Sequence, residues 1–136
     1  MTDEQAARWE ELVAEIKETA NAMHVAREEG LQLCRKLTQT SARCIRHIHR
    51  RQFDEAEMIL GEARALAGQA RRALEPFGAL FYGGYLQDAE KEMVEASAVL
   101  AMVQGRPYQG PAELGAQPMS YLNGMGEAAS ECRRFV

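Results

Sequence analysis

The sequence predicts an all-α fold, an extended antiparallel helical bundle with a long N-terminal helix, on three observations. Only four of the 136 residues are proline, and the residues that favour helices are abundant. Apolar residues recur at spacings of three and four, and no long stretch alternates apolar and polar residues as a strand would. With 46% hydrophobic residues, a chain of this length can bury a real core. Residues 1–136 are therefore interpreted as a single helical domain.

The first predicted helix covers residues 3–50. No proline interrupts it, and at 1.5 Å per residue it extends roughly 70 Å, longer than a small domain is wide. Gly30 is a candidate bend because glycine weakens a helix interior. A helix of this length is typical of an assembly, so we expect a homo-oligomer. Its apolar stripe consists of Trp9, Leu12, Val13, Ile16, Ala20, Met23, Cys34, Leu37, Ser41, Ile45 and Ile48.

The second predicted helix has a recognisable start. Asp54 is expected to cap it, with Glu57 completing a capping box and Phe53 and Met58 forming a hydrophobic staple. Pro76 is expected to end it.

Two further helices follow. One begins near Pro76 or after Gly83-Gly84 and runs to about Gln104, and a loop over residues 105–118 contains one helical turn near Pro111. The last helix is expected to begin near Ser120 as its cap. Its expected buried residues are Leu122, Met125, Ala129 and Cys132.

Cysteine usage and hydropathy point to the cytoplasm. The three cysteines Cys34, Cys44 and Cys132 form no C-x-x-C pair, which argues against a disulfide framework or a zinc site and favours a reducing compartment. The acidic N-terminus is unlike a signal peptide. The longest apolar run, residues 98–103, is far shorter than the roughly 20 residues that span a bilayer, so no membrane association is expected.

Charge is distributed unevenly. Seven basic and two acidic residues give residues 27–51 a charge of +5, although the whole chain carries −4. Such a stripe is either a solvated helix face or a site for phosphates. The candidate nucleic-acid-binding residues are Arg35, Arg43, Arg46, Arg50 and Arg51.

Acidic residues form two ridges. Asp88, Glu92 and Glu95 lie at spacings of four and three, and Glu127 and Glu131 lie four apart, so each set shares a helix face. If both ridges face one cavity, their oxygens suit Mg²⁺ or Mn²⁺. The alternative is that they are solubilising surface carboxylates. A di-iron site is set aside because none of the three histidines lies in a Glu-x-x-His motif.

Four stretches, in order and in register, resemble the translin superfamily, especially its shorter prokaryotic members. They are REEGLQLCRKLTQTSAR at 27–43, IHRRQFDEAE at 48–57, GYLQDAEKEMVEA at 84–96, and AELG at 112–115 followed by YLNGMGEAASECR at 121–133. The resemblance covers roughly residues 25–134. Family members usually continue with C-terminal helices that this chain lacks, and active members tend to carry Asp where Glu127 stands.

The resemblance implies a metal-dependent endoribonuclease that cuts RNA inside a homo-oligomeric cage, an octamer in the family. It places Glu92, Glu95 and Glu127 at the catalytic acidic positions, where they would hold Mg²⁺ or Mn²⁺, and Glu131 at a neighbouring acid. Two other interpretations stay open. The chain could be a non-catalytic protein that binds RNA or single-stranded DNA, a function that Glu127 in place of Asp favours. It could also be a helical scaffold without a nucleic-acid role.

Overall fold

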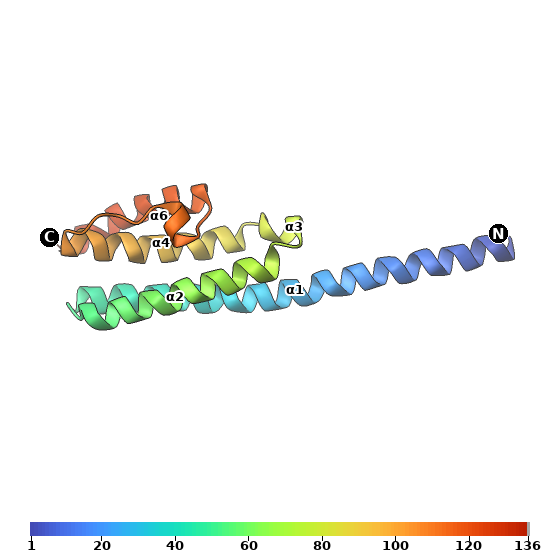
Figure 1. Ribbon diagram of the computed structural model, residues 1–136, viewed down its shortest axis with the longest axis horizontal. Helices are drawn as coiled ribbons and strands as arrows, with labels where there is room; N and C mark the ends of the chain where they lie inside the picture. The colour runs from blue at the N-terminus through green and yellow to red at the C-terminus, as the bar shows by residue number, and fades with distance from the viewer. Residues whose placement is uncertain (136) are drawn as a thin grey trace.

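The computed structural model describes residues 1–135, which form a helical bundle extended along one axis (Figure 1). The first two long helices form an antiparallel hairpin, the next packs against both, and the last covers the outer side of that helix. The elements are α1 (Asp3–His49), α2 (Phe53–Leu74), α3 (Gly78–Phe81), α4 (Tyr85–Gln104), α5 (Pro111–Leu114), α6 (Pro118–Glu131) and the 3-10 turn η1 (Cys132–Phe135). The all-α bundle with a long N-terminal helix is confirmed. Within the described residues, no helix combines the length and apolarity that crossing a membrane requires.

Helix α1 is continuous over 47 residues. A capping box begins it: the Gln5 N–H donates to Thr2 Oγ1 at 3.2 Å, and the Thr2 N–H donates to Gln5 Oε1 at 2.8 Å. Residues of α1 become buried from Ala26 onward. The preceding half projects beyond the bundle (Figure 1).

Helix α1 continues without a break through Gly30, the residue predicted as a possible bend. The residue is buried beneath Leu74 at the end of α2, and a Cβ atom at Gly30 would lie 2.6 Å from Leu74 Cγ. The absence of a side chain lets the two helices approach closely. The glycine serves packing between helices, which sequence spacing alone does not reveal.

Replacement of Gly30 by alanine is expected to lower the free energy of unfolding by about 1–3 kcal/mol, because the new methyl group overpacks the contact with Leu74. Gly61→Ala is the matched control. In the described part of the chain nothing lies within 4 Å of a Cβ atom at Gly61, so helix propensity should raise stability by up to about 1 kcal/mol. Urea unfolding followed by circular dichroism measures both changes. Equal effects of the two substitutions would contradict the packing role of Gly30.

The start of α2 differs from the prediction. The helix begins at Phe53, Gln52 precedes it, and within the described residues neither an Asp54 cap nor a capping box forms. Met58 is 72% exposed, so the expected staple with Phe53 is also wrong. The reason is a tight turn after α1, in which the Gln52 N–H donates to the His47 carbonyl at 3.0 Å. This hydrogen bond satisfies a carbonyl in the last turn of α1 and makes Gln52 the residue that precedes α2.

Helix α4 lies at the centre of the bundle. Every residue from Met93 to Ala101 is buried, because the α1–α2 hairpin covers one side and α6 covers the other. The connection after α4 returns toward its start (Figure 1). Gln87 Nε2 donates to Gln117 Oε1 at 3.1 Å near the first turns of α4 and α6, and Cys132 Sγ lies 3.2 Å from Met102 Sδ near their ends. Helix α6 therefore runs parallel to α4, whereas α1 and α2 have the antiparallel arrangement predicted for the bundle (Figure 1).

The buried face of α6 is not the predicted one. The helix begins at Pro118, so Ser120 is a buried residue of its first turn and not its cap. The buried residues of α6 are Ser120, Gly124 and Ala128, whereas Leu122 is 64% exposed. Small residues thus occupy the fully buried positions of α6, and Tyr121 and the predicted Met125 pack against the core only in part.

Gly124 explains this orientation. A Cβ atom at Gly124 would lie 2.6 Å from Val94 Cβ and 2.8 Å from the Lys91 carbonyl oxygen. The backbones of α4 and α6 therefore approach more closely at this point than any side chain on α6 would permit. The close approach sets the rotation of α6 and, with it, the direction in which its acidic residues point.

Candidate active site

The acidic residues of α4 and α6 converge. Glu95 is 8% exposed, and its pKa is raised from 4.5 to about 7. Burial is the largest cause, and the charges of Glu92, Glu131 and Glu127 and a hydrogen bond with Glu92 supply the rest of the shift. Three neighbouring carboxylates, one from α4 and two from α6, therefore lie close enough to the buried Glu95 to raise its pKa. We refer to these four residues as the carboxylate cluster.

Basic groups contact the margin of the carboxylate cluster. Lys91 Nζ lies 3.7 Å from Glu92 Oε1 and 3.8 Å from Glu127 Oε1. His49 Nε2, from α1, lies 2.6 Å from Glu131 Oε1, and the imidazole stacks on Phe135 with ring centroids 4.4 Å apart. Among the described residues, no basic side chain lies within 4 Å of the Glu95 carboxylate. In that part of the chain the acidic groups in the interior of the cluster thus have no basic partner at Glu95, and such a surrounding favours the binding of a cation.

The donor chemistry of the cluster fits a hard divalent cation, because Mg²⁺ and Mn²⁺ take carboxylate oxygens and water as ligands. In residues 1–135, however, no three acidic, histidine or cysteine side chains already have the spacing of a metal site. Ion binding would therefore require the side chains to turn toward a common point. The predicted ligands Glu92, Glu95 and Glu127 all belong to the carboxylate cluster. Asp88 lies one turn earlier on α4 and is exposed.

The five candidate arginines do not all lie on the same surface. Arg43 Nη2 pairs with Glu62 Oε2 of α2 at 2.6 Å, so it faces the hairpin. Arg35 lies beside the start of α4, in a groove that also contains Tyr85 and Asp88. Arg51 lies in the α1–α2 turn with a φ of 58°.

Arg35, Arg46 and Arg50 share one face of α1. Their spacings of eleven and four residues correspond to nearly whole turns of a helix, and all three are exposed. His49, which contacts Glu131, follows Arg46 by three residues and borders the same face. His49 thus connects the margin of this arginine face to Glu131 of the carboxylate cluster.

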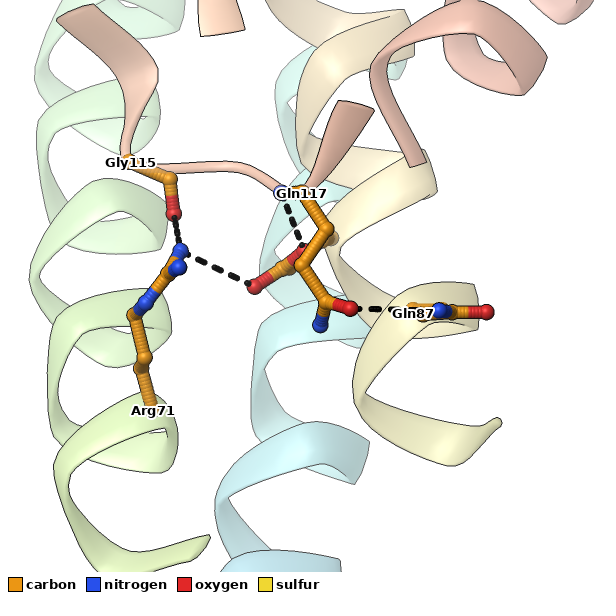
Figure 2. Close-up of polar contacts among 5 residues, drawn as sticks. Arg71, Gln87, Gly115 and Gln117 are labelled. Atoms are coloured by element: carbon orange, nitrogen blue, oxygen red, sulfur yellow. Dashed lines mark hydrogen bonds and ion pairs between the residues drawn. The ribbon is translucent and has the colours of Figure 1, made fainter. Parts of the chain in front are cut away.

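Sequence reasoning missed a buried acid that fixes the position of α6. Glu90 is fully buried, and desolvation raises its pKa. The Gln117 backbone N–H donates to Glu90 Oε2 at 3.0 Å, and Arg71 Nη1 lies 3.8 Å from Glu90 Oε1. Figure 2 shows Arg71 reaching across to Gly115, whose carbonyl accepts a 2.6 Å hydrogen bond.

This Glu90 network joins α2, α4 and the segment that begins α6, and it holds α6 in register with α4. A signal was present in the sequence. Glu90 follows Leu86 by four residues and precedes Met93 by three, so it lies on the apolar stripe of α4. A carboxylate at such a position calls for buried partners.

The arrangement is that of an all-α protein with a carboxylate cluster beside an arginine face. A solved structure described as the crystal structure of apo-NeC3PO has the same fold, with a TM-score of 0.81 and 23% sequence identity over 90% of this chain. The chain spans 64% of the length of that protein. The sequence matches no family model and no curated protein. The chain thus shares the all-α fold of that structure, with the long N-terminal helix that the sequence predicted.

Proposed function

We propose that this protein is a metal-dependent endoribonuclease of the translin type, acting on RNA within a homo-oligomer. The observation that carries the proposal is the buried Glu95, which shares its surroundings with three further carboxylates from two helices. A protein gains nothing in stability from such like-charge crowding. Crowded carboxylates are characteristic of functional sites.

The residues of the cluster have distinct roles in this proposal. Glu92, Glu95 and Glu127 would hold Mg²⁺ or Mn²⁺, which when bound would activate a water molecule and neutralise charge on the scissile phosphate. Glu131 is held by His49 at 2.6 Å, so it is positioned to accept a proton from the attacking water. Arg35, Arg46 and Arg50 would bind phosphates, which fixes the position of the RNA without reading its sequence. Arg43 and Arg51 extend the basic surface at its margin.

The cleavage test uses labelled single-stranded RNA with Mg²⁺, Mn²⁺ or EDTA. We expect metal-dependent cutting that falls at least about 100-fold in Glu92→Gln and Glu95→Gln, because weakening even a supporting contact of a metal site costs 10–100-fold. Glu55→Gln is the matched control, since Glu55 is an exposed acid on α2 that does not belong to the carboxylate cluster. Cutting that persists in EDTA, or in both cluster variants, would contradict the proposal.

Binding is tested separately from cutting. Arg46→Ala and Arg50→Ala are each expected to weaken RNA binding and to reduce the salt dependence of log K by about 0.7 per lost phosphate contact. Arg72→Ala, an exposed arginine of α2, should leave both quantities unchanged. Fluorescence anisotropy across a salt series measures them. An unchanged slope in the α1 variants would exclude the arginine face as the RNA path.

A second candidate is a protein that binds RNA or single-stranded DNA without cutting it. The observation in its favour is Lys91, whose amine lies within 4 Å of both Glu92 and Glu127 and can take the place of a metal charge. In the same assays this function gives salt-sensitive binding that is unaffected by EDTA and yields no cleavage products. A protein that binds no nucleic acid at low salt would instead be a helical scaffold.

A further inference from the structure

The projecting half of α1 exposes a continuous apolar stripe. Trp9 is 58% exposed and Ile16 is 63% exposed, and this part of the helix extends away from the rest of the bundle (Figure 1). Large apolar side chains scattered singly on a surface need no explanation, but a contiguous set on one helix face marks an interaction site.

The stripe has the spacing of a coiled coil. Its positions alternate spacings of three and four residues, which is the heptad pattern of residues that meet a partner helix. The positions before the bundle are Ala6, Trp9, Val13, Ile16, Ala20 and Met23, of which Met23 already packs in part against the core. The same pattern resumes after Arg27 with Gly30, Cys34, Leu37, Ser41, Cys44 and Ile48, all of which are buried within the bundle.

The seam along which α1 packs in the bundle therefore continues beyond the end of its partner helix. α2 ends at Leu74, which packs on Gly30, and the heptad positions before Gly30 extend past that point. We propose that a second copy of this chain covers them, with residues 6–23 of the two copies paired as an antiparallel two-helix coiled coil. The second helix would continue the direction of α2, which also runs antiparallel to α1.

Side-chain sizes select the antiparallel orientation. In this register the numbers of two paired residues, one from each copy, add up to 29. Trp9 then faces Ala20 of the second copy, Met23 faces Ala6, and Val13 faces Ile16. Every layer joins residues of complementary or similar volume, as close packing requires. A parallel pair would stack Trp9 on Trp9 and alanine on alanine, leaving some layers overfilled and others empty.

Charges support the same register. The positions that flank an antiparallel seam bring Glu10 of one copy beside Lys17 of the other, and twofold symmetry creates this pair twice. Arg27, the next seam position after Met23, would lie opposite the acidic first turn of the second copy, which contains Asp3 and Glu4. Residues 6–23 thus bring no like charges face to face along the seam.

Trp9 reports the interface directly because it is the only tryptophan in the sequence. On dilution of the full chain from micromolar to nanomolar concentration, its fluorescence should shift to longer wavelength as the indole becomes exposed. Analytical ultracentrifugation should show the matching loss of mass. A wild-type chain that is monomeric at micromolar concentration, with an exposed-tryptophan spectrum, would overturn the proposal.

Variants then test the surface and the register. Ile16→Ser should raise the dissociation constant at least about 100-fold, since two buried isoleucines are lost per pair of copies. Val25→Ser is the matched control, because Val25 is 64% exposed on α1 but lies off the seam. Circular dichroism should show that both variants keep the fold. An Ile16→Ser chain that associates as tightly as Val25→Ser would refute the interface.

For the register, Glu10→Lys and Lys17→Glu should each weaken association several-fold, and their combination should restore it. A combination as weak as the single variants would overturn the antiparallel register. None of these measurements uses RNA or metal, so they are independent of the proposed nuclease function.

Discussion

Gly124→Ala is expected to lower the free energy of unfolding by about 3 kcal/mol, the upper part of the range for overpacking a well-packed contact. The new methyl carbon would meet Val94 Cβ at 2.6 Å and the Lys91 carbonyl oxygen at 2.8 Å. A backbone oxygen cannot rotate away as a flexible side chain can, so α6 must move off α4. For a chain of this size, the loss corresponds to a melting temperature lower by about 10 °C.

Gly126→Ala is the control for this substitution. It lies two residues further along α6, is exposed, and within residues 1–135 has nothing within 4 Å of its Cβ position. Helix propensity should therefore raise its stability by up to about 1 kcal/mol. Thermal and urea unfolding of both variants measure the difference. Two melting temperatures that move together would show that the close approach at Gly124 does not hold α6 on α4.

The same contact shows why the face of α6 could not be predicted from the sequence. Apolar patterning assigns the larger residues Leu122 and Met125 to the core, because it assumes that a helix packs through its side chains. Here α6 packs through its backbone at Gly124, so Leu122 faces outward. The packing role of Gly30 was missed for the same reason. In both cases the decisive neighbour, Val94 or Leu74, lies on another helix, and helix spacing carries no information about it.

What could be predicted was local to each helix. The uninterrupted apolar stripe predicted α1 correctly, and the helical turn at Pro111 and the end of α4 at Gln104 were also placed correctly. The rows Glu92–Glu95 and Glu127–Glu131 follow from helical spacing alone. Their convergence depends on the parallel course of α6 beside α4, which results from the returning connection after α4. The buried Glu90 network depends on the same tertiary arrangement.

Glu95→Gln is expected to remove a pH dependence of stability that the wild-type protein has. Burial and the neighbouring carboxylates raise the pKa of Glu95 from 4.5 to about 7 in the folded state. Between these values the folded protein retains a proton that the unfolded chain has released, so stability decreases as pH rises from about 4.5 to 7. The full decrease is about 3 kcal/mol, since one pKa unit corresponds to 1.36 kcal/mol.

The variant cannot ionise at this position, so its stability should match that of the wild type near pH 4.5 and exceed it by up to about 3 kcal/mol at pH 8. Urea unfolding at several pH values measures the difference, and the buried Glu90 contributes equally to both proteins. If the stability of the two proteins changed with pH in the same way, Glu95 would not be the source of the pH dependence. Because the wild type is destabilised by unmet negative charge at neutral pH, a divalent cation that binds the cluster should raise its melting temperature more than that of Glu95→Gln. That readout requires no RNA, so it separates metal binding from cleavage.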